Sequence, residues 1–175
     1  GSLIVDCTFG GGNYTKEFLK YPKTKVIALD RDKTVINKAN KIKEKNPEKF
    51  LFFNEKFSNL DKVISKDSKP NAIIFDLGLS MQQLQDYSRG FSFNSKEKID
   101  MQMGLSFLSA EEVVNTFDEK TLKLIIKIFG DEKEASKIAR NIIISRRKKR
   151  ISNISELVEI IKKSKKRNLN KKINV

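Results

Sequence analysis

Glycine and carboxylate residues recur in this chain at the ends of short apolar runs, where they can bind a small ligand. The clearest case is Asp6–Gly12, in which an apolar run ends in an acid and is followed by Thr8, Gly10 and Gly12. Glycines let the backbone approach a ligand closely, and the amides at the start of a following helix attract anionic groups. Dinucleotide-binding loops have a third glycine at the position that Thr15 occupies here. The spacing leaves open a dinucleotide, another nucleotide-like ligand, or a tight turn without a ligand.

Two further acids stand at the ends of later apolar runs. Asp30 follows the run Val26–Leu29 and comes 20 residues after Gly10, which suits an acid that accepts hydrogen bonds from ribose hydroxyls. Asp76 follows the run Ala72–Phe75. Because ligands of open α/β sheets bind at the carboxyl ends of the strands, we expect both acids to face one crevice with the glycine loop. The alternatives are a surface acid at Asp30 and a helix N-cap at Asp76.

The elements that must position these residues are short buried strands joined by helices. Apolar runs of about four residues are typical of parallel strands buried on both faces, and the segments between the runs have helical spacing. The runs are Leu3–Asp6, Val26–Leu29, Phe50–Phe53 and Ala72–Phe75, and the helical stretches are Tyr14–Leu19, Thr34–Lys45 and a short one from Leu60 to Ile64. This alternation predicts an α/β fold with a partial doubly wound parallel sheet.

The second half of the chain has the apolar periodicity of amphipathic helices. Their boundaries are marked by a capping box at Ser109–Glu112, by Gly130 after an apolar stripe, by a box-like start at Asp131 and Glu134, and by Asn153 with Glu156. The segment Gly78–Gly104 has little periodicity and is expected to be a long functional loop. We therefore expect a partial ligand-binding α/β domain over 1–80, a connecting functional loop over 81–104, and an inserted small helical domain for substrate recognition over 105–175.

Composition excludes several classes of site. Hydrophobic residues make up 38 % of the chain, enough for a core, and no apolar run approaches the roughly 18 residues of a membrane helix. Cys7 is the only cysteine and there is no histidine, which excludes disulfides within the chain, Cys/His zinc sites and Ser-His or Cys-His catalysis. We expect a cytoplasmic protein with no metal site and no membrane partner. Nothing in the sequence indicates the oligomeric state.

The positive charge is concentrated at one end. The net charge is +14, and from Arg146 to Val175 twelve Lys or Arg stand against two Glu. Such an end suits a polyanionic partner, with RNA or DNA first and an anionic membrane second, although a solvated Lys-rich surface is the plain alternative. We expect one cluster to project into solvent and contact phosphate: Arg146, Arg147, Lys148, Lys149 and Arg150.

Three stretches are long and idiosyncratic: Asp76–Asp86 reads DLGLSMQQLQD, Arg89–Phe93 reads RGFSF and Ile99–Met103 reads IDMQM. They strongly resemble the bacterial 16S ribosomal RNA cytosine-N4 methyltransferases, the RsmH or MraW family, whose pattern reads D-L-G-V-S-S-x-Q-L-D, R-G-F-S-F and L-D-M-R-M. The glycine loop is similar to that family's D-x-T-x-G-x-G, and Val26–Asp32 and Phe57–Leu60 match too. The resemblance covers nearly all of the chain.

The resemblance implies a Rossmann-like fold, S-adenosylmethionine as the methyl donor, and transfer to N4 of a cytidine in the decoding region of 16S ribosomal RNA. The implied partner is that RNA or the small ribosomal subunit. Carried over by position, the donor-binding residues are Gly10, Gly12, Asn13, Tyr14, Asp30, Phe57, Asp76 and Gln83. The loop amides would hold the methionine part, Asp30 the ribose and Phe57 the adenine, with Asp76 and Gln83 near the sulfonium. No catalytic residue is assigned.

The chain departs from the family pattern at three positions. Asn13 replaces a glycine that is usual there, and we expect its tolerance of positive φ to preserve the turn. Tyr14 stands where many members have histidine, and Gln102 where arginine is usual, which removes a basic contact.

Segments that the family has before the first strand and after the helical part are missing. We therefore expect a fragment truncated at both ends, poorly soluble and inactive on its own. Its strands are expected in the order 3-2-1-4, with Ala72–Phe75 at an open edge. The alternatives for function are a non-catalytic RNA-binding module on a methyltransferase scaffold, and methylation of DNA or protein.

Overall fold

A computed structural model describes residues 1–65 and 67–165, which divide into two compact units. We name them the sheet unit, residues 1–82 and 103–107, and the helical unit, residues 83–102 and 108–165. Most of the segment expected as a connecting loop thus belongs to the helical unit, while residues 103–107 return to the sheet unit. The last ten residues of the segment 105–175 lie outside the described residues.

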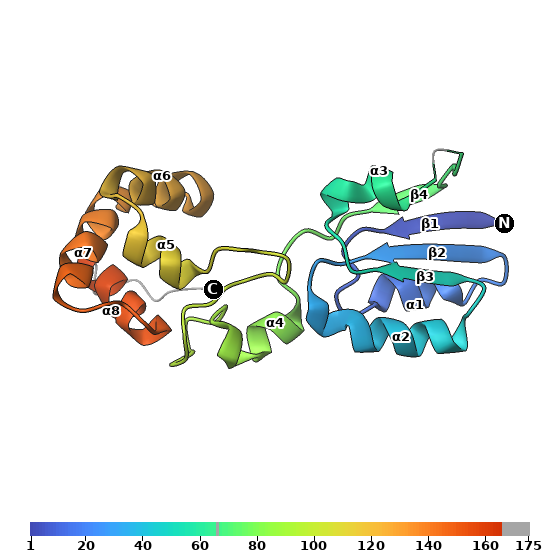
Figure 1. Ribbon diagram of the computed structural model, residues 1–175, viewed down its shortest axis with the longest axis horizontal. Coiled ribbons are helices and arrows are strands. Elements are labelled where there is room, and N and C mark those ends of the chain that lie inside the picture. The colour runs from blue at the N-terminus through green and yellow to red at the C-terminus, as the bar shows by residue number, and fades with distance from the viewer. Residues whose placement is uncertain (66, 166–175) are drawn as a thin grey trace. The chain divides into compact units, whose positions relative to one another are not determined.

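The sheet unit alternates strands and helices, as Figure 1 shows. Its elements are β1 (Ser2–Asp6), α1 (Asn13–Leu19), β2 (Thr24–Leu29), a 3-10 turn (Lys33–Val35), α2 (Ile36–Lys45), β3 (Phe50–Phe53), a 3-10 turn (Phe57–Asn59), α3 (Leu60–Val63) and β4 (Ala72–Ile74). The strands are all parallel and lie in the order β3-β2-β1-β4. The predicted partial doubly wound sheet and its strand order are confirmed.

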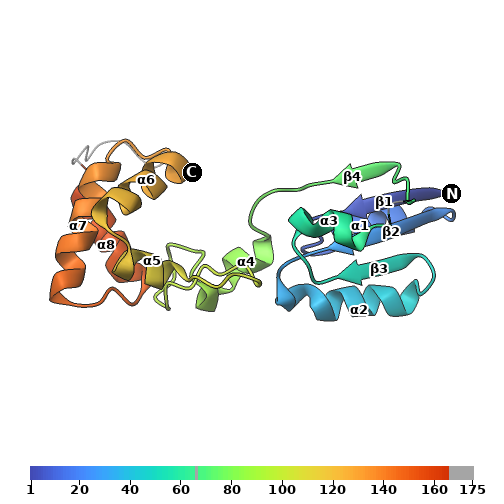
Figure 2. The same ribbon diagram turned by 45° about the horizontal axis from the view of Figure 1, so that its top comes forward.

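Helices cover both faces of the sheet, with α1 and α2 on one side and α3 on the other (Figures 1 and 2). On β2, Val26 and Ala28 join the core under α1 and α2, whereas Ile27 and Leu29 pack with residues of α3. Successive strand residues point to opposite faces, so a sheet covered twice needs apolar residues at every position. This requirement is why unbroken apolar runs predicted the strands.

Strand β4 lies at one edge of the sheet. It pairs with β1 through Ile4–Ala72, Val5–Ile73 and Asp6–Ile74. Within the described part of the chain, no strand pairs with its outer edge, as expected for the 3-2-1-4 order. Ile73 is accordingly 46 % exposed although it is apolar.

The boundary between the two units falls within α4, whose residues from Gln83 on belong to the helical unit. Its elements are α4 (Met81–Gln85), a 3-10 turn (Tyr87–Arg89), α5 (Ala110–Thr116), α6 (Glu119–Gly130), α7 (Ala135–Lys148) and α8 (Ile154–Ser164). The capping box at Ser109 and Glu112 and the cap at Asn153 are both present. Leu122, Ile138 and Ile142 form part of a common core. Among the described residues, no helix is long and apolar enough to cross a membrane.

Three expectations about this unit are wrong in detail. Gly130 is the last residue of α6, and the left-handed cap is Asp131, with φ 44°. Asp131 does not cap α7, which begins after Glu134 without any side-chain cap. The segment Gly78–Gly104 is not a plain loop but contains α4 and a 3-10 turn. Its order comes from side-chain to backbone hydrogen bonds, such as that from Ser95 Oγ to the Tyr87 carbonyl at 2.7 Å, which leave no periodic pattern.

Candidate functional site

Three carboxylates meet at the carboxyl edge of the sheet. Asp6 is the last residue of β1, Asp30 follows β2, and Asp76 comes two residues after β4. Burial raises the pKa of Asp6, and the negative charges of Asp30 and Asp76 raise it further. Two further negative charges therefore lie close enough to Asp6 to disfavour its ionised form, and all three acids belong to the sheet unit.

Asp6 fixes the base of the glycine loop. Its side chain is fully buried and accepts hydrogen bonds from Thr15 Oγ1, at 2.8 Å, and from the Thr8 amide, at 3.2 Å. One carboxylate thus joins β1, the loop and α1. The sequence placed Asp6 at the start of the candidate site but did not reveal its hydrogen bond to Thr15, because a buried polar pair nine residues apart has no distinctive pattern.

Asp30 holds the glycine loop from the side of β2. Its Oδ2 accepts the Gly10 amide at 2.7 Å and its Oδ1 accepts the Asp32 amide at 2.9 Å. Burial, the largest cause, raises the pKa of Asp30, and the two amides oppose that rise. A carboxylate oxygen has more than one acceptor position, so the half-buried group can also accept a ligand hydroxyl.

The loop turns at a glycine that no other residue can replace without rearrangement. Gly12 has φ 71°, and a Cβ there would lie 2.8 Å from the Phe9 ring. Helix α1 begins at the next residue, so Asn13 is helical and its expected tolerance of positive φ is not needed. Asn13 and Tyr14 are both exposed on the first turn of α1.

An aromatic pair adjoins the acids. The rings of Phe57 and Phe75 meet edge to face, with centroids 5.6 Å apart, and both side chains stay more than 40 % exposed. Phe57 was expected near a ligand, whereas Phe75 was read only as part of a strand. The amide of Asp76 donates to Thr8 Oγ1 at 2.8 Å, which ties the end of β4 to the loop. Asp76 is not a helix N-cap, since α4 begins only at Met81.

Gln83 belongs to the helical unit, where it is buried in α4. The other predicted donor-binding residues all belong to the sheet unit, and a role for Gln83 beside them stays a prediction.

The return segment 103–107 is held against the sheet unit by Arg31. The Arg31 guanidinium donates to the Met103 carbonyl and to Ser106 Oγ, each at 2.7 Å. Gly104 has φ 63°, and a Cβ there would overlap the Arg31 carbonyl oxygen. Met103, the last residue of a family-like stretch, is thus held by the residue that follows Asp30.

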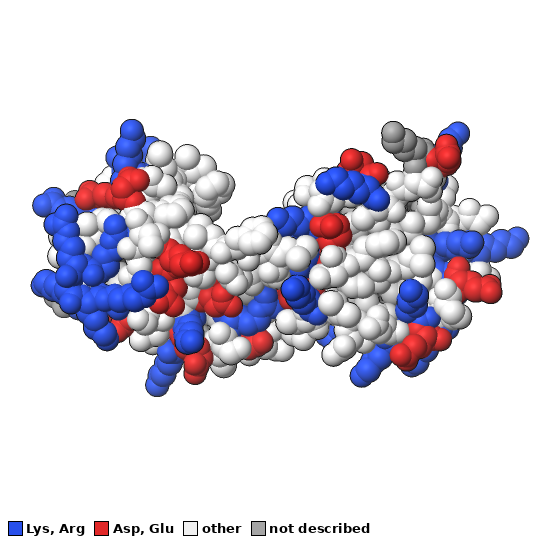
Figure 3. Space-filling view, in the orientation of Figure 1, with Lys and Arg blue, Asp and Glu red and all other residues white. Residues whose placement is uncertain are grey.

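The basic cluster 146–150 is only partly free to meet a partner. Lys and Arg side chains gather over the end of the helical unit that carries α7 (Figure 3). Arg146, however, is half-buried and donates to the carbonyls of Val114 and Phe117, at 2.9 and 2.6 Å, at the end of α5. The expectation that it projects into solvent is wrong, because a helix end leaves carbonyls that need donors.

The other four members of the cluster are exposed. Two of them pair with acids on the helical unit: Lys149 with Glu156 at 2.7 Å and Arg150 with Glu111 at 2.8 Å. In the described structure, the exposed cations without an ion-pair partner in the cluster are Arg147 and Lys148.

Among the described residues, no group of Cys, Asp or Glu is arranged to hold a metal ion. The sheet unit combines a glycine turn, a half-buried carboxylate at Asp30, and two exposed aromatic rings next to Asp76. These are groups that suit a cationic nucleoside ligand.

Comparison with known proteins agrees with this architecture. The model of the MraW methylase family matches residues 1–175. The chain is 43 % identical over 160 residues to the ribosomal RNA small subunit methyltransferase H of Orientia tsutsugamushi (strain Ikeda), covering 91 % of this chain and 51 % of that protein. It is 40 % identical over 164 residues to the protein of the same name from Rickettsia canadensis (strain McKiel), covering 94 % of this chain and 53 % of that protein.

The chain thus spans about half the length of the curated relatives it matches. The parallel sheet flanked by helices is the Rossmann-like fold of such methyltransferases. Because the family model matches residues 1–175 of the chain, the chain belongs to the MraW methylase family.

Proposed function

We propose that this chain carries the donor-binding half of a methyltransferase that uses S-adenosylmethionine to methylate N4 of a cytidine in the decoding region of 16S ribosomal RNA. The observation that carries the proposal is the convergence of Asp6, Asp30 and Asp76 beside the glycine loop. Family membership and the names of the relatives support it.

The charge of the site favours this donor over a dinucleotide. S-adenosylmethionine carries a positive sulfonium and a positive ammonium, whereas a dinucleotide carries a negative pyrophosphate. Three carboxylates at one edge would repel a pyrophosphate and attract a sulfonium. We assign the methionine part to the loop at Gly10 and Gly12, with the first turn of α1 at Asn13 and Tyr14.

The remaining groups would hold the nucleoside. Asp30 has acceptor positions left for the ribose hydroxyls, and Phe57 offers an exposed ring to the adenine. Asp76, exposed at the end of β4, is assigned to the crevice near the sulfonium, and Gln83 is proposed to join it.

The donor, when bound, supplies its methyl group from the sulfonium to the attacking nitrogen. This chain supplies no cysteine nucleophile for a covalent route: Cys7 is buried, and burial raises the pKa of its thiol to about 11. Direct transfer to an exocyclic amine needs no such nucleophile. It does need an acceptor for the amine proton, and Asp76 is the nearest candidate in this chain, although we leave the catalytic residue unassigned.

The substrate side rests on charge. A net charge of +14 and the exposed Arg147 and Lys148 suit a phosphate backbone. We propose 16S ribosomal RNA or the small ribosomal subunit as the partner and the cytoplasm as the location. We expect this half of the protein alone to have no methyltransferase activity.

Calorimetric titration with S-adenosylmethionine tests the donor site, and mass spectrometry of rRNA nucleosides from cells with and without the intact protein tests the product. We expect saturable binding and loss of N4-methylcytidine in the deleted strain. RNA binding without donor binding would favour the non-catalytic RNA-binding module. Donor binding with an unchanged nucleoside profile would reject the N4 assignment.

A further inference from the structure

A groove between α1 and α2 has no role in the donor site. It encloses about 440 Å³ and lies wholly within the sheet unit. Its lining consists of Lys16, Leu19, Lys20, Lys38, Lys41, Ile42, Lys45 and Asn46. Five of these eight residues are lysines, and no carboxylate lines the groove.

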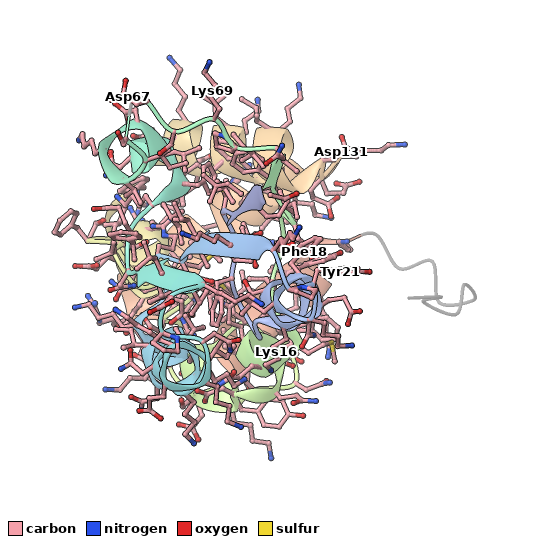
Figure 4. The ribbon with its side chains drawn as sticks, turned by 90° about the vertical axis from the view of Figure 1, so that its right-hand side faces the viewer. Lys16, Phe18, Tyr21, Asp67, Lys69 and Asp131 are labelled. Atoms are coloured by element: carbon pink, nitrogen blue, oxygen red, sulfur yellow. The ribbon has the colours of Figure 1, made fainter. Side chains whose placement is uncertain are left out.

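The lysines form two rows along the walls. Lys16 in α1 and Lys20, the residue that caps the end of α1, are four residues apart and so lie on one side of that helix. Lys38, Lys41 and Lys45 follow at three- and four-residue intervals on α2, which makes a stripe about 10 Å long. Figure 4 shows Lys16 on the side of the sheet that carries these helices, and Asp67 and Lys69 on the opposite side.

Partners within the sheet unit neutralise little of this charge. Lys20 pairs with Glu17 at 2.6 Å, while the ammonium groups of Lys16 and Lys38 bond neutral oxygens, those of the Gly11 carbonyl and the Gln82 side chain. The ammonium groups of Lys41 and Lys45 have no hydrogen-bond or ion-pair partner among the described residues. Like charges lining one concave surface repel one another, and a bound polyanion relieves that repulsion.

The floor of the groove is apolar. Leu19 and Ile42 lie there, each only 8 % exposed, and no aromatic side chain lines it. Basic walls without aromatic rings suit the backbone of a nucleic acid rather than stacked bases, so contact there would not depend on base sequence.

We propose that the α1–α2 groove is a second RNA-backbone site, separate from the donor site and from the basic cluster on α7. This site rests on the proposed RNA substrate. It extends that proposal, because part of the RNA-binding surface then lies on the unit that binds the donor. The groove contributes affinity, and base recognition comes from other parts of the protein.

The test replaces Lys20, Lys41 and Lys45 with glutamine, which removes three cations from both walls. A control variant replaces three exposed lysines outside the groove with glutamine, namely Lys25, Lys43 and Lys69. Binding to a labelled single-stranded RNA of about twenty nucleotides is measured over a series of KCl concentrations. Titration with S-adenosylmethionine, in parallel, reports whether each variant is folded.

Each phosphate contact in a single strand contributes about 0.7 to the slope of log affinity against log salt. The groove variant is expected to lose about 2 from that slope, while the control variant keeps the slope of the unchanged protein. Equal slopes for the groove variant and the unchanged protein would overturn the groove site and leave the proposed function standing. An unchanged protein that binds the donor but no RNA at low salt would overturn the proposed RNA substrate and the groove together.

Discussion

Replacement of Asp30 by alanine should weaken the donor site in two ways. The variant loses the acceptor of the Gly10 amide, at 2.7 Å, and that of the Asp32 amide, at 2.9 Å. It also loses the proposed acceptor of a ribose hydroxyl. Hydrogen bonds to a charged group contribute about 1.5–3 kcal/mol each. Part of that loss is offset, because burial raises the pKa of Asp30 and the variant no longer has to bury this charged group.

We therefore expect S-adenosylmethionine to bind the Asp30→Ala variant about 1–3 kcal/mol more weakly, or roughly 5- to 150-fold. Isothermal titration calorimetry on the intact protein measures the change. Asp67→Ala removes an equal charge from an exposed loop of the same unit and should leave the affinity unchanged. Equal affinities for both variants would refute the assignment of Asp30.

A ligand without the ribose hydroxyl separates the two contributions. If Asp30 accepts that hydroxyl, a 2′-deoxy analogue of S-adenosylhomocysteine should bind the unchanged protein about tenfold more weakly than the parent compound. The Asp30→Ala variant should barely distinguish the two ligands, because the partner of the hydroxyl is already gone. If the variant discriminates as strongly as the unchanged protein, Asp30 acts only by holding the loop.

Four further variants have distinct expected outcomes. Burial raises the pKa of Asp6, so its ionised form destabilises the folded protein at neutral pH. Asp6→Asn should therefore raise the free energy of unfolding at pH 7, measured by chemical denaturation. This gain should vanish below about pH 4, where the Asp6 side chain is protonated in both the folded and the unfolded protein. Arg146→Gln should lower the urea stability of the helical unit by about 1–3 kcal/mol, since two helix-end carbonyls lose their donor; full stability would show that water serves them equally well. Replacing Arg147 and Lys148 with glutamine should instead keep stability and reduce the salt slope of single-stranded RNA binding by about 1.4, whereas an unchanged slope would make these cations a solvated surface. Gly104→Ala should cost about 1–3 kcal/mol in a urea titration, because its Cβ would overlap a backbone carbonyl at positive φ; a neutral effect would mean that the return segment shifts freely.

The strands were the most predictable part of the fold. Phe50–Phe53 was predicted with the bounds that β3 has, because all four residues are apolar. The start of β2 was placed at Val26 instead of Thr24, since backbone pairing extends through the polar Thr24 and Lys25 without changing the ladder. The predicted helix from Thr34 likewise opens with a 3-10 turn capped by Asp32.

What the sequence concealed are contacts between distant residues. Arg146 reads as one member of a charged run, yet its acceptors lie about thirty residues earlier, at Val114 and Phe117. The α1–α2 groove forms only when two helices pack on one face of the sheet. In the sequence, each of these short helices shows only scattered lysines, so the groove could not be predicted. Phe75 reads as a core residue, and its exposure follows from its place just beyond an edge strand.

The position of β4 also has a consequence for synthesis of the protein. After Ile74, no strand occurs in the described residues up to Lys165, so about 90 further residues are translated while the outer edge of β4 stays bare. At about 5–20 residues per second, that takes on the order of 5–20 seconds. During this time the nascent chain exposes unpaired backbone groups of β4 beside the apolar Ile73. A ribosome-associated chaperone that covers this strand edge would therefore act mainly in this interval.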